Sequence, residues 1–592
     1  MILNELGNYR KERTIFRNRL NLLTVLLAIF TVIITARLFF LQVLRYDLYR
    51  NLANQNAIAV VPLSPQRGKI YDRNGILLAE NRKVYSLLGC FKTTKERETT
   101  LTAISKFLTL PKISENQPLN KQEILKPDLS EKELSTFLVR SYQFPMLQTK
   151  IIQERHYLYP ELFAHVIGYL GKLDKNSLSP DLQDNYVGTI WIGKSGIEKE
   201  YEERLHGYAG YEEVVVNAHK QPLKVLTRHV SKKGQDIFLT LDLNLQRAAS
   251  RAFGSSKGAV VAINPQNGEI LAMVSRPGFD NNLFLTRGPD LLTLLHSKNN
   301  PLFNRATKGL YAPGSTIKPF IAIIALDENF IQGSTTILDQ GWFKLSGSSR
   351  IFHDWLLKGH GRVNISKAII ESSDIFFYRL AFLMGIENLS RGLKKFHFGQ
   401  KTGLNIEENA GILPSATWKK KYLGKLWSQA DTVMAGIGQS YWEVTPVQLA
   451  TATAILARRG RICRPHLVLS QKTKDFAEEL NHPTITKQTW SQVINAMSQV
   501  TTRGTAKSSF GPTAYQVAAK TGTSQVILRS ALKKGGLTET HNSLFIAFSP
   551  LDSPQLAIAV VVEHNTGNAA RVGRQIFDSF YRKKNFTNRS TN

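Results

Sequence analysis

Cysteine is almost absent from this chain. Only two cysteines occur in 592 residues, Cys90 and Cys463, and neither belongs to a CxxC spacing. A disulfide framework is therefore excluded, and the sequence offers no thiol redox motif. Internal repeats and low-complexity tracts are also absent.

Acidic residues are scarce relative to basic ones. Asp and Glu number 46 against 76 Lys and Arg, which gives a formal net charge of +30. Such a surface favours anionic partners. The chain has no zinc-finger spacing and no RNA-recognition signature, so we expect no nucleic-acid partner.

Long hydrophobic runs are absent except for one near the N-terminus. The run from Leu20 to Ala36 carries no charge and follows five basic residues between positions 10 and 19. As a helix it rises about 26 Å, and the apolar stretch up to Leu44 can complete a core of about 30 Å. The run has no small-x-small cleavage site, which argues against the alternative, a removed signal peptide. We therefore expect a cytoplasmic tail at 1–19 and an uncleaved transmembrane anchor at 20–44, with the rest of the chain outside.

Beyond the anchor, the residue pattern divides the chain into two regions. Residues 50–230 alternate short strand-like pieces with charged helical stretches, which predicts an elongated mixed α/β pedestal. Residues 236–585 have apolar strands at both ends and helices between them. This order predicts an α+β domain, with one antiparallel sheet covered by helices.

The first candidate catalytic motif is YAPGSTIKPF, in which Lys318 follows Ser315 by three residues. We expect Pro313 and Gly314 to form a turn that opens a helix at Ser315. That spacing places the hydroxyl and the amine on one face, where an uncharged amine can take the hydroxyl proton. A capped helix with a surface lysine would give the same pattern, so this motif alone does not establish catalysis.

Two further motifs supply groups that an acyl transfer needs. Ser372 and Asp374 lie in AIIESSDIFFY, and Lys520 begins the run KTGT. A second hydroxyl can pass a proton to a leaving group. A strand ending in KTGT offers a cation, hydroxyls and a free edge amide to a substrate carboxylate. In this order, the three motifs form the signature of penicillin-interacting serine enzymes.

With these motifs, the chain resembles the class B penicillin-binding proteins, and most closely the elongation-specific penicillin-binding protein 2. The resemblance extends from RGKIYDRNGILLAE, through IGKSGIEKEYEERLHGYAG and HDWLLKGHGRV, to FIAFSP. The second motif reads Ser-x-Asp, where septal relatives usually have Ser-x-Asn. A septal enzyme and a catalytically silent penicillin-binding sensor remain the alternatives.

The resemblance implies a peptidoglycan D,D-transpeptidase that cleaves D-Ala-D-Ala and transfers the acyl group to an amine of another stem peptide. It implies an acyl-enzyme on Ser315 with Lys318 as its base. Ser372 and Lys520 would assist proton transfer, and Asp374 would organise their hydrogen bonds.

The same resemblance assigns substrate binding to the third motif. Thr521 and Thr523 would hold the terminal carboxylate, and Gly522 would permit a close approach of the backbone. The backbone amides of Ser315 and Thr523 would form the oxyanion hole. A second KTG, at Lys401, leads into LNIEENAGILP rather than a strand pair, and we expect it to be structural.

A metal site is a further hypothesis. Asp339, Asp354 and His360 resemble three ligands of a zinc site that some relatives complete with a cysteine. Here Ser373 occupies that fourth position, and a neutral hydroxyl is a poor zinc ligand. We therefore expect no required cofactor, and a hydrogen-bonded Asp/His cluster is the favoured interpretation.

The remaining expectations concern partners and location. By resemblance, the protein binds peptidoglycan stem peptides and β-lactams and is a single-pass protein of the inner membrane, with a periplasmic catalytic domain. The sequence shows no glycosyltransferase module before the catalytic domain. We therefore expect a SEDS-type polymerase and elongation-complex proteins as partners, contacted through the anchor and the pedestal.

Overall fold

The computed structural model describes residues 2–46, 58–110, 119, 122–174, 178–216, 222–286, 288–347, 349–461, 463–469, 485–527, 539–565 and 567–589. Its contacts divide the chain into two units. The first comprises residues 1–65, 178–188 and 208–232, and the second comprises 66–177, 189–207 and 233–592.

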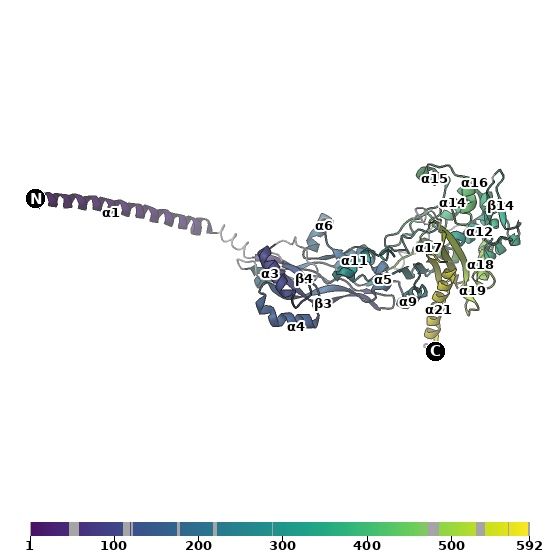
Figure 1. Ribbon diagram of the computed structural model, residues 1–592, viewed down its shortest axis with the longest axis horizontal. Helices are drawn as coiled ribbons and strands as arrows, with labels where there is room; N and C mark the ends of the chain where they lie inside the picture. The colour runs from purple at the N-terminus through teal and green to yellow at the C-terminus, as the bar shows by residue number, and fades with distance from the viewer. Residues whose placement is uncertain are drawn as a thin grey trace. The chain divides into compact units, whose positions relative to one another are not determined.

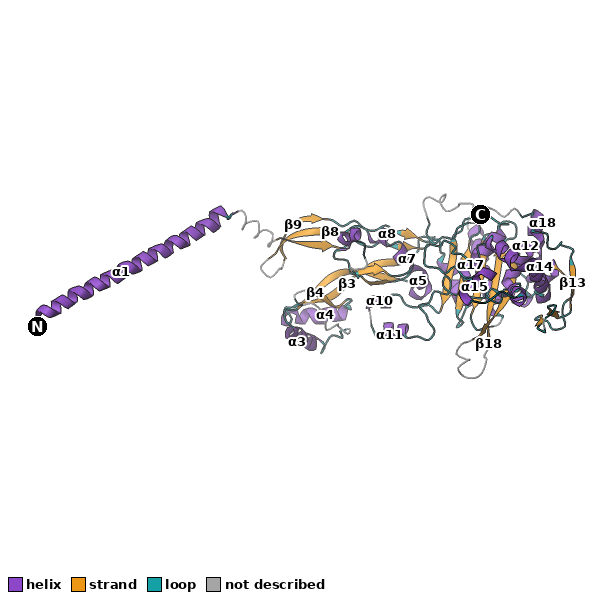
Figure 2. Ribbon diagram, turned by 90° about the horizontal axis from the view of Figure 1, so that it is seen from above, coloured by secondary structure: helices purple, strands orange, loops and turns teal. Residues whose placement is uncertain are grey.

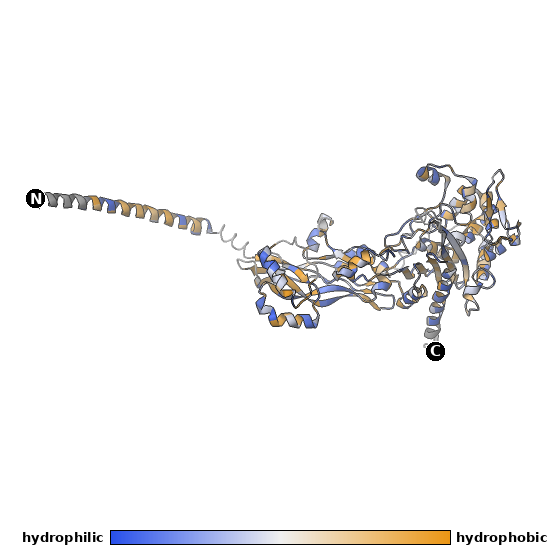
Figure 3. Cartoon of the chain, viewed as in Figure 1, coloured by the Kyte–Doolittle hydropathy of each residue, from blue (hydrophilic) through white to orange (hydrophobic). Residues whose placement is uncertain are grey.

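The first unit begins with a long helix, α1 (Ile2–Phe39), which ends in a π-helical turn (Phe40–Leu44). The segment Arg13–Leu44 has a mean hydropathy of 2.4, and no residue of its apolar window is buried. Figure 3 shows this part of α1 largely in the hydrophobic colour. The hydroxyls of Thr24, Thr31 and Thr35 each donate to the carbonyl four residues earlier. Their polarity is thus satisfied inside the helix, and the helix has the length and composition to cross a membrane.

The remainder of the first unit is a small antiparallel sheet. Its strands lie in the order β1 (Ile58–Leu63), β8 (Gly210–Val216), β9 (Pro222–His229). Two short helical turns, α6 (Pro180–Gln183) and Asp184–Tyr186, precede β8 in the chain.

The second unit contains the rest of the pedestal region. The long strands β3 (Leu77–Cys90) and β5 (Leu147–Tyr157) pair over eleven residues. An apolar cluster that includes Leu87, Ile104 and Phe137 joins this sheet to its two helices, α3 and α4. The other elements are β2 (Ile70–Tyr71), α3 (Thr94–Ile104), β4 (Gln122–Lys126), α4 (Glu131–Arg140), Ser141–Gln143, α5 (Pro160–Ile167), β6 (Leu170–Lys172), β7 (Trp191–Gly193), α7 (Gly196–Glu200), α8 (Glu202–His206) and β10 (Ile237–Phe238).

A buried ionic network connects two of the stretches that carry the family resemblance. Arg67, from RGKIYDRNG, contacts Glu198 and Glu202, from SGIEKEYEE, at 2.6 and 2.7 Å. Arg155 on β5 contacts Glu198 at 2.7 Å. Burial alone would raise the pKa of Glu198, but Arg155 and Arg67 outweigh it and hold that pKa below its usual range. The network therefore links β5 to the segment that contains Arg67 and to helices α7 and α8, which contain Glu198 and Glu202.

The predicted α+β region, residues 236–585, is built on a five-stranded antiparallel sheet. The strand order is β12 (Ile270–Arg276), β11 (Gly258–Ile263), β19 (Leu556–Val562), β18 (Glu539–Ser549), β17 (Ala518–Ile527). Strands from the two ends of the region are thus adjacent, and β17 forms one edge. Figure 2 shows these strands surrounded by helices.

Helices cover both faces of this sheet. Every residue of β11 and β19 is buried, and because side chains alternate between faces, both faces must be covered. Helices α9 and α21 pack on each other and on the sheet, and α17 and α18 pack on it separately. The helices of the region, labelled where visible in Figure 1, are α9 (Leu243–Ala252), α10 (Leu283–Thr286), α11 (Pro289–Leu295), α12 (Lys318–Asp327), α13 (Ile365–Glu371), α14 (Asp374–Lys394), α15 (Ala416–Leu423), α16 (Gln429–Ala435), α17 (Pro446–Ala457), α18 (Lys487–Val500), α19 (Lys507–Phe510) and α21 (Asn568–Arg589).

The predicted fold class is confirmed, and both cysteines are free. The domain boundaries stay a prediction, because the two compact units cut across residues 50–230.

Replacing Glu198 by Gln tests the buried network. The change leaves two guanidinium groups short of a buried carboxylate, so we expect the free energy of unfolding to fall by about 3 to 5 kcal/mol. The matched control is Glu407→Gln, which removes an exposed carboxylate bound by Lys199 and Lys308 and should cost less than about 1 kcal/mol. Urea unfolding of the full chain measures both; equal losses would contradict a structural role for the network.

Candidate active site

The first motif lies at the start of α12, and the helix begins later than the sequence predicted. Residues Gly314–Ile317 form a 3-10 turn, and the α-helix starts at Lys318. Pro at the second helical position suits this start, because its missing N–H would be unpaired there. Ser315 is partly exposed, whereas Lys318 is fully buried.

Glycines bring the first motif against the third. Gly314 has φ +53°, and a Cβ there would lie 2.5 Å from the Thr523 carbonyl oxygen. Its N–H donates to the Gly438 carbonyl at 2.9 Å, and a Cβ on Gly438 would lie 2.2 Å from the Gly314 carbonyl oxygen. Only glycine fits either position, because both the left-handed backbone and the close approach exclude a side chain.

The second motif lies in the tight connection between α13 and α14. Ser372 has φ 61° and ψ 37°, a left-handed conformation that is uncommon outside glycine. Ser373 then caps α14 by accepting from the Phe376 N–H. This turn directs Ser372 and Asp374 toward Lys318.

The Lys318 amine is bound by the second motif. It donates to the Asp374 carboxylate at 2.7 Å and to the Ser372 carbonyl at 2.8 Å, and it lies 3.4 Å from the Ser372 hydroxyl. Its Nζ also lies 5.3 Å from the centre of the Phe377 ring. The Ser315 hydroxyl is not among the partners of this amine in the described part of the chain.

Lys520 reaches the same hydroxyl from the edge strand β17. Its amine donates to the Ser372 Oγ at 2.8 Å and to the Thr521 carbonyl at 2.9 Å. Burial, together with the charge of nearby Lys318, lowers the pKa of Lys520 well below its usual range, against the smaller opposite effect of Asp374. Two buried amines therefore share one hydroxyl, and Lys520 is poised to be neutral.

The remaining residues of the third motif, Thr521 to Thr523, also lie on β17. Thr523 is exposed, and its carbonyl accepts from the Gln439 side chain at 3.2 Å. The Thr521 hydroxyl shares a hydrogen bond of 2.6 Å with Thr505. A Cβ at Gly522 would meet the Thr316 methyl at 2.8 Å, so this glycine lets β17 pack against the first motif.

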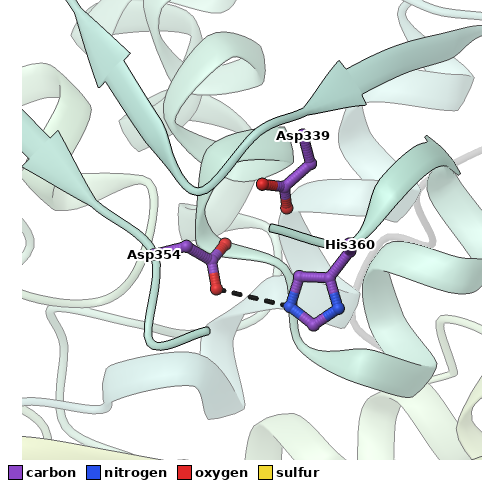
Figure 4. Close-up of side chains that lie close together, drawn as sticks. All are labelled: Asp339, Asp354 and His360. Carbon is purple, nitrogen blue, oxygen red and sulfur yellow. Dashed lines mark ion pairs between the residues drawn. The ribbon is translucent and has the colours of Figure 1, made fainter. Parts of the chain in front are cut away.

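The three predicted metal ligands also come together (Figure 4). One ligand atom from each of Asp339, Asp354 and His360 lies within 4.8 Å of the others, and all three residues are buried. His360 Nδ1 contacts Glu371 at 2.9 Å, while Nε2 lies 3.3 Å from Asp354 and has no hydrogen bond among the described residues. An imidazole held in this way can offer Nε2 to a cation.

The fourth position does not complete such a site. The Ser373 hydroxyl donates to Asp339 at 2.6 Å, and Asp354 accepts from the N–H groups of Asp374 and Ile375 at the start of α14. Burial works against a charged His360 ring, but its contacts with Asp354 and Glu371 raise the pKa of His360 overall. Three donors fit zinc and the fourth does not, while the hydrogen bonds alone already brace the second motif.

The second KTG lies outside any strand. Glu408 accepts from the Thr402 hydroxyl and from the Gly403 N–H, both at 2.8 Å. The Gly403 carbonyl also accepts from the Arg464 side chain at 2.7 Å, and the structural role of this segment stays a prediction.

Sequence reasoning missed several residues that hold the site. Gln439 and Thr505 contact the third motif, and Gly438 contacts the first. Asp354, which the sequence suggested only as a metal ligand, accepts from the start of α14. Gly438 and Gln439 lie in the stretch AGIGQSYWEV. Its two glycines and glutamine were the available signal.

Two family profiles match the chain. Residues 258–582 match the penicillin binding protein transpeptidase domain, and residues 62–239 match the penicillin-binding protein dimerisation domain.

Full-length relatives agree with these matches. The chain is 37% identical to the peptidoglycan D,D-transpeptidase MrdA of Haemophilus influenzae over 97% of this chain and 93% of that protein. It is 38% identical to the MrdA of Acinetobacter baumannii over 98% and 90%.

Solved structures show the same relationship. The complex of penicillin-binding protein PBP2 and MreC from Helicobacter pylori aligns with a TM-score of 0.76 at 29% identity, covering 89% of this chain and 99% of that one. Pseudomonas aeruginosa PBP2 in complex with WCK 5153 aligns with a TM-score of 0.68 at 33% identity, covering 88% and 96%. The chain therefore belongs to the penicillin-binding protein transpeptidases, in the group of the peptidoglycan D,D-transpeptidases MrdA.

Proposed function

We propose that this chain cross-links peptidoglycan through an acyl-enzyme on Ser315, during cell elongation and shape maintenance. The observation that carries the proposal is the buried contact of Lys318 and Lys520 with one Ser372 hydroxyl, beside a partly exposed serine. Relatives named MrdA and PBP2 support this assignment over a septal one.

The reaction divides into two acyl transfers. The Ser315 Oγ attacks the penultimate D-Ala carbonyl of one stem peptide, an ester forms, and the terminal D-Ala leaves with a proton on its new amine. The amine of a second stem then attacks the ester, so that an amide forms and the serine oxygen regains its proton.

Proton transfer follows the chain of contacts between the two lysines. Lys318 takes the Ser315 proton, and it can do so only after it has itself given one up. A path for that proton runs through the Ser372 hydroxyl to Lys520, whose burial favours the neutral form. Asp374 holds the Lys318 amine in place at 2.7 Å.

The third motif receives the donor peptide. Thr521 and Thr523 bind its terminal carboxylate, and the backbone amides of Ser315 and Thr523 stabilise the oxyanion. The glycine contact between Gly314 and the Thr523 carbonyl supports this role, because it sets the separation of the two amides through the backbone alone.

The location and partners follow from the anchor and from the relatives. Basic residues before the apolar segment of α1 support a cytoplasmic N-terminus at the inner membrane and a periplasmic catalytic domain. The PBP2 of H. pylori is complexed with MreC, and a peptidoglycan synthase complex aligns at 26% identity with a TM-score of 0.68, covering 95% of this chain and 98% of that one. Both support elongation-complex partners and a SEDS-type polymerase here.

Replacing Ser315 by Ala tests the nucleophile. We expect no covalent labelling by a fluorescent penicillin and no D-Ala release from a stem-peptide substrate, because the change removes the hydroxyl that attacks. Ser334→Ala, an exposed serine, is the control and should label normally. Labelling of wild type without any D-Ala release would instead indicate the silent sensor.

Replacing Lys318 tests the proton path. Lys318→Met and Lys318→Arg should each slow penicillin acylation at least about a hundredfold, because neither side chain can accept the serine proton. The double variant Lys318→Met/Asp374→Asn removes both members of the buried ion pair and controls for an unpaired carboxylate. Stopped-flow labelling measures the rates, and the idea fails if a folded single variant acylates within about tenfold of wild type.

We also propose that the enzyme needs no metal, and that the Asp339, Asp354 and His360 cluster braces the second motif. Protein purified and incubated with zinc should hold it substoichiometrically by elemental analysis, because Ser373 supplies no thiolate. Ser373→Cys is the matched variant and should bind zinc more tightly. One tightly held zinc per wild-type chain would overturn the proposal.

A further inference from the structure

A basic and aromatic surface lies on the same domain as Ser315 and has no part in the reaction described above. It is formed by α15 and the loop that follows it, TWKKKYLGKLW at 417–427, together with one ring from a neighbouring loop. Tyr422 and Leu426 are 64% and 80% exposed. We call this surface the basic platform; its members are Trp418, Lys420, Lys421, Tyr422, Lys425, Trp427 and Tyr441.

A buried lysine fixes the rings of the basic platform. Lys419 is buried and contacts Asp431 at 2.6 Å, and its Nζ lies 5.8 Å from the centre of the Trp427 ring and 5.1 Å from that of Tyr441. Tyr441 in turn lies 5.6 Å from Trp418 and 6.1 Å from Trp427. The rings therefore form a preorganised cluster around one cation.

The three lysines that belong to the basic platform lack anionic partners among the described residues. Lys420, Lys421 and Lys425 are exposed, and within the described residues none of them forms an ion pair. The acid closest in sequence, Asp431, is already engaged by Lys419 and by the Ser428 cap. Three cations on one short segment repel each other unless an anion lies among them.

The basic platform is connected directly to the catalytic groups. Tyr441 follows Gln439, which binds the Thr523 carbonyl, and Gly438, which binds the Gly314 N–H. Helix α16, which follows the platform loop, packs on α14 of the second motif. One end of the platform, Tyr441, is thus two residues from a side chain that contacts the third motif.

We propose that the basic platform binds the carboxylates of neighbouring stem peptides on the glycan strand whose stem occupies the active site. This inference rests on the proposed function, because every uncrosslinked stem ends in a carboxylate and the third motif binds only one of them. A strand with many stems is a polyanion, and the lysines complement it in charge. Binding a second stem raises the effective concentration of the first at Ser315.

The test uses the full chain in detergent, with its active site blocked by benzylpenicillin. The ligand is a fluorescently labelled, uncrosslinked glycan strand carrying pentapeptide stems, and anisotropy measures its dissociation constant. In the triple variant K420Q/K421Q/K425Q we expect that constant to rise about tenfold at low salt. Salt should weaken wild-type binding in the same way, because exposed charges are screened.

Matched controls separate the basic platform from general charge. The variant K95Q/K106Q/K132Q removes three exposed pedestal lysines and should leave the constant within about twofold. Strands whose carboxylates are amidated should bind wild type as weakly as the platform variant binds native strands. Thermal melting checks that all variants are folded.

Three results would overturn the assignment. The first is wild-type affinity in the platform variant, the second is equal affinity for amidated strands, and the third is an equal loss in the pedestal control. Lost binding to phosphatidylglycerol vesicles with unchanged strand binding would assign the surface to lipid. If penicillin does not acylate wild type, the proposed function fails, and strand binding without the antibiotic still tests the platform.

Discussion

Two lysine amines are buried around one serine hydroxyl, and the catalytic region is organised to hold them there. Neither Lys318 nor Lys520 is exposed to solvent, and Asp374 forms an ion pair with Lys318. Such a placement is costly unless the charges are paired or one is lost. The lowered pKa of Lys520 is the outcome of that cost. The chemistry we propose uses this imbalance, because a buried amine with a lowered pKa can receive a proton through the Ser372 hydroxyl.

The backbone, more than the side chains, sets the distance between the first and third motifs. Gly314 and Gly438 meet through a hydrogen bond and a contact that leaves no room for a Cβ, and Gly522 packs on the first motif in the same way. Backbone contacts vary less than contacts between long side chains, since they have no rotamers to exchange. The two amides that we propose as oxyanion donors are therefore held in place by the backbone alone.

The second motif depends on support from outside the catalytic set. The left-handed Ser372 needs its neighbours to hold it, because its backbone conformation is strained for a serine. Asp354 holds the start of α14 through two N–H groups, and Ser373 binds Asp339. Where a cysteine could recruit a metal to this position, a network of hydrogen bonds performs the bracing. Helix α14 also packs on α16, the helix that follows the loop of the basic platform, so one scaffold supports both the second motif and that surface.

The sequence alone determined the α+β class, the apolar anchor, the family and the three motifs, because periodicity, charge and short spacings are local properties. It placed the start of the catalytic helix at Ser315, whereas the helix begins at Lys318. It also could not show that Lys318 contacts the second motif, or that Gln439 and Thr505 support the third. Those contacts join residues far apart in the chain. The folded sheet brings strands from the two ends of this region together and leaves β17 at its edge. Only this tertiary arrangement decides which buried groups come into contact and which charged groups have no partner.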